Sequence, residues 1–193
     1  MKKLLSKPEK EEDYMKYRWF FTSSKKLVIG GKSAEQNEEI VKELIKGGKN
    51  FIVMHTKEPG SPFAVIESES PSEKDLEEIA IFTGSFSRAW REKKKKVIID
   101  VFQISQVIKK GNMKTGTFGV VGDVKHKTVE LKLYLVEQKG KLRAVPQKID
   151  KALCIEPGNI NKDVISEQIA IKLEIPQEEV LQALPTGGSK ICN

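Results

Sequence analysis

The chain has little of the chemistry that metal sites and disulfide scaffolds require. Its 193 residues include two cysteines, Cys154 and Cys192, which form no CxxC pair, and two histidines far apart in sequence. These few scattered ligands make a poor zinc site and offer no disulfide framework. We therefore predict no metal, no cofactor and no disulfide, and we expect a reducing, cytoplasmic environment.

Long hydrophobic runs are also absent, which argues against a membrane-spanning helix. The N-terminus, MKKLLSKPEKEEDYMK, starts with basic residues as a signal peptide does. Only Leu4 and Leu5 follow before Pro8 and a cluster of charges, so we expect no signal peptide. We interpret residues 1–16 as a flexible charged arm.

Positive charge is present in excess, and it comes mainly from one stretch. The formal net charge is +7, and residues 85–117 alone carry an excess of the same size. Phe86, Trp90 and Phe102 lie among these charges, and a basic run interleaved with aromatic residues suits a phosphate polymer with exposed bases. The alternatives are a solvated lysine face and, for Trp90 and Phe102, burial in the core.

The order of expected elements favours an α+β fold. Short apolar or alternating runs predict strands over residues 17–22, 27–29, 51–56, 63–67, 97–102, 118–121, 128–136 and 142–145. Ser33 and Ser72 stand at N-cap positions and predict two helices, one ending at a Gly-Gly pair and one running to about Glu92. Because no βαβ repeat is present, we predict a mixed, mainly antiparallel sheet with two main helices packed on it.

The last forty residues differ in charge and pattern. We predict a domain over 17–150 and a small acidic, two-helix appendage over 151–193, with helices at 163–173 and 177–184. The spacing of these helices resembles a helix-turn-helix, but the second carries Glu178 and Glu179 and no basic residue, so it would repel DNA. A packing or partner-docking role for residues 163–184 is therefore favoured.

Two local motifs have both a structural and a functional interpretation. The sequence GGKSAEQNE lacks the glycine that a Walker loop needs, since Lys26 stands at that position. It remains either a helix N-terminus open to an anion or a plain strand-to-helix turn. His55 and Lys57 end a strand beside a Pro-Gly-Ser turn, and a lone histidine there is typical of structural hydrogen bonding unless a catalytic partner is present.

Taken in order, several segments resemble the NFACT-R domain. This RNA-binding domain ends the ribosome quality-control factors that recruit tRNA to stalled large subunits, and it also occurs in stand-alone archaeal proteins. The segments are FTSSKKLVIGGKSAEQNE (21–38), MHTKEPGSPFAVI (54–66), SRAW (87–90) and QVIKKGNMKTGTF (106–118). With their spacing they cover about residues 16–136. Many members have a histidine soon after the Pro-Gly-Ser turn, where this chain has Pro62 and Phe63.

The resemblance implies RNA binding, to tRNA or ribosomal RNA, with the ribosomal large subunit as a partner. The RNA-binding residues that it and the basic pattern indicate are Arg18, Ser23, Ser24, Lys25, Gly31, Lys32, Asn37, His55, Lys57, Ser61, Arg88, Arg91, Lys93, Lys94, Lys95, Lys96, Lys109, Lys110 and Lys114. Two alternatives stay open: an RNA-modifying or RNA-processing enzyme, and a protein adaptor that docks through its C-terminal helices. No triad, carboxylate pair or metal-ligand spacing supports a reaction, so we predict a non-enzymatic protein.

Overall fold

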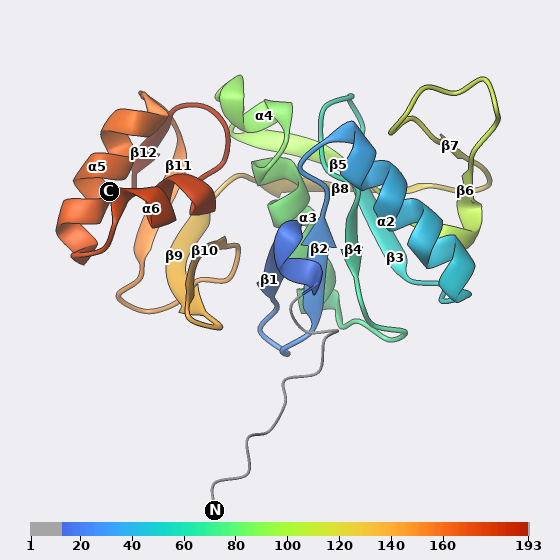
Figure 1. Cartoon of the computed structure of the whole chain (residues 1–193), viewed down its shortest axis with the longest axis horizontal. Helices are drawn as coiled ribbons and strands as arrows, with labels where there is room; N and C mark the ends of the chain where they lie inside the picture. The colour runs from blue at the N-terminus through green and yellow to red at the C-terminus, as the bar shows by residue number, and fades with distance from the viewer. Residues whose placement is uncertain (1–12, 193) are drawn as a thin grey trace, which may run out of the picture.

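The computed structural model describes residues 13–192 (Figure 1). Residues 1–12 of the predicted arm lie outside this part of the chain. The first described element is a short 3-10 helix, η1 (Tyr14–Lys16). Its Tyr14 is buried and stacks edge-on against Trp19 with ring centroids 5.2 Å apart.

The centre of the molecule is a six-stranded sheet in the order β1-β2-β4-β3-β5-β8. Its strands are β1 (Arg18–Phe21), β2 (Leu27–Gly30), β3 (Ile52–Thr56), β4 (Ala64–Ile66), β5 (Lys96–Gln103) and β8 (Lys125–Glu130). Every neighbouring pair in it is antiparallel. The predicted α+β class with a mainly antiparallel sheet is confirmed.

A second, four-stranded sheet has the order β10-β9-β11-β12 and forms one side of the molecule with α5 and α6 (Figure 1). Its strands are β9 (Leu133–Gln138), β10 (Lys141–Val145), β11 (Leu153–Ile160) and β12 (Ser189–Ile191). A two-stranded ribbon of β6 (Val107–Ile108) and β7 (Gly119–Val120) completes the β structure, with the 3-10 turn η2 (Ile104–Gln106) before it. The two helices beside the second sheet are α5 (Lys162–Leu173) and α6 (Gln177–Ala183).

The prediction of one strand over residues 128–136 is wrong. The chain leaves β8 after Glu130 and starts β9 at Leu133, in the other sheet. Leu131 lies in the connection, where its backbone N–H donates to the Lys95 carbonyl at 2.9 Å. Apolar residues continue to alternate through the connection because both strands bury one face, so the pattern does not mark the change of sheet.

Two of the helices, α2 (Ala34–Gly47) and α3 (Glu73–Ser85), cover opposite faces of the six-stranded sheet. Successive strand residues such as Val53 and Met54 belong to two different core clusters, as the period of a strand requires. Ile40 of α2 packs in the Val53 cluster, while Ile79 of α3 packs in the Met54 cluster. The serine N-caps predicted for both helices are present.

The second helix is shorter than predicted, and a separate α4 (Arg88–Arg91) follows it. The Ser87 hydroxyl ends α3 by donating to the Gly84 carbonyl at 2.6 Å and starts α4 by accepting from Ala89 N–H at 3.1 Å. The Arg88 N–H donates to the Gly60 carbonyl at 2.8 Å, a contact distant in sequence that amphipathic periodicity does not reveal.

The prediction of no disulfide is also wrong, because Cys154 and Cys192 are bonded to each other with Cα atoms 5.3 Å apart. β11 and β12 pair with Ile155 opposite Ile191, which brings the flanking cysteines together. Among the described residues, no group of three or more histidine, cysteine or acidic side chains is arranged to hold a metal ion. No described helix is long and apolar enough to cross a membrane.

Candidate nucleic-acid interface

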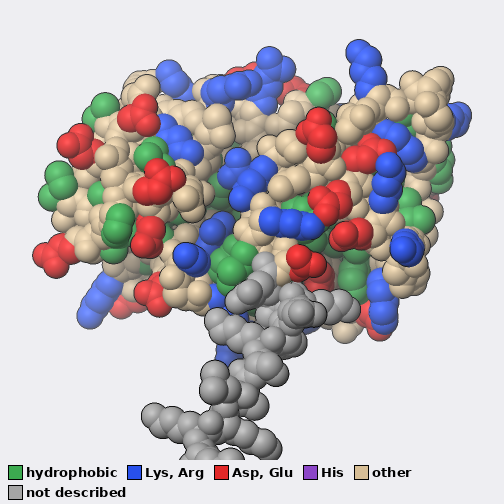
Figure 2. All heavy atoms as spheres, in the orientation of Figure 1, with side chains coloured by type: hydrophobic (Ala, Val, Ile, Leu, Met, Phe, Trp, Pro, Cys, Tyr) green, Lys and Arg blue, Asp and Glu red, His purple; other side chains and the backbone are tan. Residues whose placement is uncertain are grey.

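A groove of about 740 Å³ lies where β1, the β2–α2 turn and the end of β3 approach α4. The basic side chains that line it come from different elements: Arg18, Lys32, Lys57, Arg88 and Arg91. Among its described lining residues, Asp100 is the only one with a carboxylate. Figure 2 shows Lys and Arg side chains along the edge that carries α4 and over the middle of the face, between the C-terminal helices and α2. The groove is therefore a concave, positively charged surface.

The first basic residue of the groove, Arg18 of β1, is held over an aromatic ring. Its guanidinium carbon lies 4.8 Å from the centroid of Phe86, which is half-buried between α3 and α4. Burial lowers the pKa of Arg18, but an arginine keeps its charge at neutral pH. The groove thus combines a fixed cation with an aromatic side chain at one wall.

The Gly-Gly turn is held together by its own side chains. A Cβ on Gly31 would come within 2.8 Å of the Asn37 backbone nitrogen and closer still to its side-chain oxygen, so the turn requires glycine there. The Lys32 N–H donates to the Gln36 side chain at 2.9 Å, and the Asn37 side-chain oxygen accepts from Phe63 N–H at 3.0 Å. These internal bonds match the plain strand-to-helix turn, and the Lys32 side chain is what the turn presents to the groove.

His55 lines the groove in a defined tautomer. Its Nδ1 lies 2.6 Å from the Thr56 carbonyl oxygen, which can only accept, so Nδ1 carries the proton. Burial lowers the pKa of the ring, which keeps it neutral and leaves Nε2 as an acceptor. The ring packs on Phe63 with centroids 4.9 Å apart. This arrangement offers a hydrogen-bond acceptor to a donor group in the groove.

The Pro-Gly-Ser turn beside His55 is closed by the Ser61 hydroxyl. This hydroxyl accepts from Thr56 N–H at 2.9 Å and donates to the Pro62 carbonyl at 3.1 Å. Gly60 adopts φ +106°, and its carbonyl accepts from Arg88 N–H. The turn therefore fixes the first residue of α4, Arg88, whose side chain lines the groove and is ion-paired with Glu92 at 3.1 Å.

The basic loop between β6 and β7 is held against α2 by Lys109. Its ammonium contacts the Glu38 carboxylate at 2.8 Å and donates to the carbonyls of Lys114 at 2.7 Å and Thr117 at 3.0 Å. Hydrogen bonds from Lys109 and from Gly116 N–H lower the pKa of Glu38 to about 2. All three donors of Lys109 are engaged, whereas Lys110 and Lys114 are exposed.

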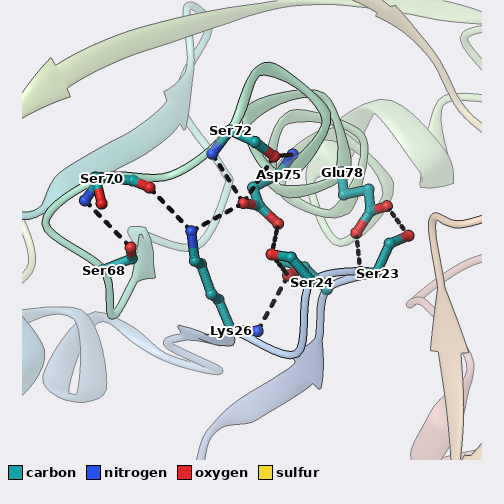
Figure 3. A network of polar contacts seen from close by, with 9 residues as sticks. Ser23, Ser24, Lys26, Ser68, Ser70, Ser72, Asp75 and Glu78 are labelled. Atoms are coloured by element: carbon teal, nitrogen blue, oxygen red, sulfur yellow. Dashed lines mark hydrogen bonds and ion pairs between the residues drawn. The ribbon is translucent and has the colours of Figure 1, made fainter.

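Ser23 and Ser24 lie at the opposite end of the β1–β2 hairpin from the groove, where these exposed serines contact the buried carboxylates of Glu78 and Asp75 (Figure 3). Ser23 donates from its backbone N–H at 2.8 Å and from its hydroxyl to Glu78, and the Ser24 hydroxyl donates to Asp75 at 2.5 Å. Although burial opposes it, bonds from Ser24, Thr22 and Ser72 hold the pKa of Asp75 below its ordinary value. This network joins the hairpin turn to the start of α3.

The run of lysines after α4 lies outside the groove. Lys94 is ion-paired with Glu58 at 2.7 Å and with Glu92 at 3.2 Å, and Lys96 with Glu130 at 3.3 Å. Lys93 and Lys95 are exposed, and no carboxylate of the described residues forms an ion pair with either. About half of this run is therefore neutralised locally.

Trp90 and Phe102, whose role the sequence leaves open, are buried core residues. Trp90 is fully buried and Phe102 is 4% exposed. The Trp90 indole N–H donates to the Ser189 hydroxyl at 3.0 Å, which ties α4 to β12. The aromatic rings near the groove that retain partial exposure are those of Phe86 and Phe118.

The structure brings together nine of the predicted site residues in the groove. They are Arg18, Gly31, Lys32, Asn37, His55, Lys57, Ser61, Arg88 and Arg91. The other predicted residues, Ser23, Ser24, Lys25, Lys93, Lys94, Lys95, Lys96, Lys109, Lys110 and Lys114, do not line it. The predicted site residues do not include Phe63 and Thr186, which also line the groove, nor Phe86, which the sequence indicates only as one of the aromatic residues in the basic stretch. Nothing local in the sequence marks Thr186, which reaches the groove through the C-terminal fold.

The family model described as NFACT protein RNA binding domain matches residues 16–122. The chain therefore belongs to the NFACT RNA-binding domain family. Its family membership makes it an RNA-binding domain and not a catalytic one.

Two curated proteins are similar to the chain. The archaeal Rqc2 homolog aRqcH of Methanocaldococcus jannaschii is 32% identical over 212 residues, which cover 99% of this chain and 31% of that protein. The ribosome quality control complex subunit NEMF homolog of Drosophila melanogaster is 31% identical over 118 residues, covering 56% of this chain and 11% of that protein. The chain thus spans less than a third of the length of each relative.

A solved structure shares the fold. The C-terminal part of the fibronectin/fibrinogen-binding protein from Streptococcus suis superimposes with a TM-score of 0.50 at 20% identity. The match covers 67% of this chain and 47% of that one. At this identity the likeness concerns the fold alone.

Proposed function

We propose that this chain binds tRNA or ribosomal RNA through the groove, as part of ribosome-associated quality control in the cytoplasm. The observation that carries the proposal is the convergence of basic side chains from separate elements on one concave surface, whose described lining holds one carboxylate, that of Asp100. The printed names of the two relatives, a Rqc2 homolog and a ribosome quality control subunit, support the cellular setting. The matched family supports RNA as the ligand.

The groove residues divide the work of recognition by their chemistry. The exposed Lys57, Arg88 and Arg91 neutralise backbone phosphates, which gives affinity without sequence preference. The Nε2 acceptor of His55 receives a hydrogen bond from a 2′-hydroxyl or a base amino group. The half-buried Phe86 contributes an apolar wall against an unstacked base. We therefore expect a preference for loops and junctions over continuous duplex.

The predicted residues outside the groove have a secondary part in this proposal. Exposed lysines such as Lys25, Lys93, Lys95, Lys110 and Lys114 add long-range attraction toward RNA. That attraction falls steeply with ionic strength, because exposed charges are screened within about 10 Å at 0.1 M salt. Ser23, Ser24 and Lys109 act through their internal bonds, which hold the surrounding loops in place.

The test is fluorescence-anisotropy binding to tRNA, to an anticodon stem-loop and to duplex DNA over a salt series. Each phosphate contact contributes about 0.7 to 0.9 to the slope of log K against log salt, so losing one lowers affinity about 5- to 8-fold near 0.1 M salt. The double variant Arg88→Gln, Arg91→Gln should therefore bind tRNA about 25- to 60-fold more weakly. The control Lys46→Gln, Lys74→Gln removes the same charge from exposed positions outside the groove.

The outcome decides between specific recognition and surface charge. Binding that favours tRNA and is lost in the groove variant but kept in the control supports the proposal. Equal, weak binding of all three nucleic acids, reduced to the same extent in both double variants, would mean that only net charge matters.

A second proposal concerns the C-terminal helices as a protein-docking surface. Val164 and Ile171 lie seven residues apart on α5, so they share one face, and their exposures are 49% and 74%. We propose that this apolar face, flanked by acidic residues, docks on a protein of the ribosomal large subunit. Ile171→Ser should weaken co-sedimentation with purified large subunits, whereas Ile149→Ser, which removes an exposed isoleucine elsewhere, should not. Equal sedimentation of both variants would reject this surface.

A further inference from the structure

The lining of the groove includes a carboxylate, that of Asp100, among its basic side chains. A carboxylate repels the phosphates that the surrounding cations attract, so it weakens the part of RNA binding that comes from phosphate contacts. The same group suits a base, because an aspartate accepts hydrogen bonds from the N–H groups at a base edge. The position of Asp100 therefore indicates where the groove would meet a base.

Asp100 of β5 lies beside His55 of β3, and both side chains line the groove. The two residues are opposite each other in the antiparallel pairing of β3 and β5. Lys57 N–H donates to the Ile98 carbonyl two positions further along this ladder. Because hydrogen-bonded pairs recur at every second position, His55 and Asp100 are also such a pair, with Cα atoms about 5.5 Å apart. Their side chains are thus neighbours on one face of the sheet.

Both side chains offer hydrogen-bond acceptors. The Nδ1 of His126, the residue opposite Asp100 on β8, lies 2.8 Å from Asp100 Oδ1 and donates to it, since a carboxylate only accepts. Within residues 13–192 the Oδ2 atom of Asp100 receives no hydrogen bond, and the side chain is 26% exposed. His55 donates its Nδ1 proton to the Thr56 carbonyl, which leaves Nε2 as an acceptor. The groove therefore presents two acceptors side by side.

Aromatic side chains lie next to this pair of acceptors. The His55 ring packs on Phe63 with centroids 4.9 Å apart, and Phe63 meets the rings of Phe102 and Phe118 at 6.2 and 5.0 Å. All three phenylalanines line the groove with His55 and Asp100. Apolar walls with a small number of placed polar groups are typical of a site for a flat ring system. This part of the groove thus has the chemistry of a base site.

The four RNA bases differ in the donors of their Watson–Crick edges. Guanine has two adjacent donors, the ring N1–H and the 2-amino group. Adenine and cytosine have an amino donor next to a ring nitrogen that accepts, and uracil has one N–H between two carbonyl acceptors. Two neighbouring acceptors in a protein are therefore both satisfied by guanine, whereas each of the other bases would bring an acceptor against an acceptor.

We propose that Asp100 and His55 form a reading site for an unpaired guanine in the bound RNA. The carboxylate accepts from one donor of the guanine edge and His55 Nε2 accepts from the other. Arg88 and Arg91, which line the same groove, contact the neighbouring phosphates. The inference deepens the proposed function and rests on it for RNA as the ligand.

The first arm of the test uses stem-loop RNAs that share one stem and have loops of uridine. A single guanosine is placed at each loop position in turn, and binding is followed by fluorescence anisotropy. At the favoured position, guanosine should raise the affinity about 5- to 140-fold over uridine, as one bidentate pair does. Inosine at that position, which lacks the 2-amino group, should give an intermediate affinity.

The variants are compared by the ratio of guanosine to uridine affinity. Asp100→Asn should abolish the preference, because the amide replaces an acceptor oxygen with a donor. The lost charge itself raises the affinity for every loop alike and leaves the ratio unchanged. His55→Phe, which keeps a ring on Phe63 but lacks Nε2, should lose part of the preference. The control Asp123→Asn removes a carboxylate from an exposed position outside the groove and should keep it. Thermal unfolding of the variants verifies that they are folded.

The second arm uses free 5′-GMP and 5′-UMP as probes, which separates this inference from the proposed function. Millimolar GMP should raise the Tm of the wild type and of Asp123→Asn more than UMP does, but not that of Asp100→Asn. If the wild type binds the stem-loops without a guanosine preference, or Asp100→Asn keeps one, the reading site is overturned while the groove proposal stands. If GMP acts through Asp100 but no stem-loop is bound, the base site holds and the polymer is wrong.

Discussion

Replacing Gly31 with alanine tests whether the groove depends on the close approach of two chain segments. The new Cβ would lie 2.8 Å from the Asn37 backbone nitrogen and would overlap the Asn37 side-chain oxygen. Both segments are buried or half-buried, so the added methyl causes overpacking, which costs about 1–3 kcal/mol. Displacing the Asn37 side chain also leaves the Phe63 N–H without its acceptor, at about 1–3 kcal/mol.

The two costs together predict a loss of about 2–6 kcal/mol in the free energy of unfolding for Gly31→Ala. Urea unfolding followed by tryptophan fluorescence measures this, because Trp19 and Trp90 are both buried. Gly47→Ala is the matched control, since a methyl added at this helical position meets no neighbouring group within 4 Å. It should stabilise the protein by up to about 1 kcal/mol, because alanine has the higher helix propensity.

A double-mutant cycle sharpens the same prediction. In Asn37→Ala the side chain that meets the new methyl is already missing, so Gly31→Ala should cost less in that background by at least about 1 kcal/mol. Additive effects, or a Gly31→Ala protein as stable as the wild type, would refute the argument that this contact requires glycine.

Three further perturbations follow from single contacts. Trp90→Phe should lower the free energy of unfolding by about 2–4 kcal/mol, since it opens space in the core and removes the hydrogen bond to Ser189. Calorimetry measures this loss, and a value below about 1 kcal/mol would contradict the role given to the hydrogen bond. The Cys154–Cys192 bond closes a loop across a separation of 38 residues, so its reduction should lower the free energy of unfolding by up to about 4 kcal/mol. Unfolding experiments with and without reductant measure this loss, and an unchanged midpoint would contradict it. Because the pKa of Glu38 falls from 4.5 to about 2, its stabilising contribution is complete above pH 4.5 and is lost as the pH falls toward 2. The difference in stability between wild type and Glu38→Gln should therefore shrink over that range, and a pH-independent difference would argue against it.

The elements that sequence predicts well are those with local signals. Ser33 and Ser72 cap α2 and α3 through bonds to residues within the first turn, so the pattern of a few neighbours is enough. The breaks that it misses depend on distant partners. α4 begins as a separate helix where the Arg88 N–H meets the Gly60 carbonyl, and β8 ends beside Leu131, whose N–H meets the Lys95 carbonyl.

The residues of the candidate site also divide into those beside local motifs and those placed by contacts distant in sequence. Groove residues such as Lys32 and His55 stand beside turns whose motifs are visible in the sequence. Arg143 is an isolated basic residue in unremarkable sequence surroundings, and only the approach of β10 to β1 brings it to the Trp19 carbonyl. The cysteine pair was missed for an equivalent reason, because the register of β11 and β12 is a property of the fold.

The motif pieces that carried the family resemblance mostly act as braces between segments far apart in sequence. Ser24 of the hairpin turn binds Asp75 of α3, and Asn37 of α2 binds the backbone at Phe63. Glu38, the next residue of α2, holds the basic loop through Gly116 N–H. Each brace joins an element that carries groove cations, or borders the groove, to another part of the fold.

Bracing residues and phosphate-contacting residues should affect RNA binding in different ways. A rigid scaffold raises the RNA affinity of cations on long flexible side chains, because less conformational entropy is lost when RNA binds. Removal of a brace should therefore reduce RNA affinity without removing any charge, and the slope of log K against log salt should stay as it is. Removal of a groove arginine should change both, so the slope separates a residue that shapes the groove from one that contacts phosphate.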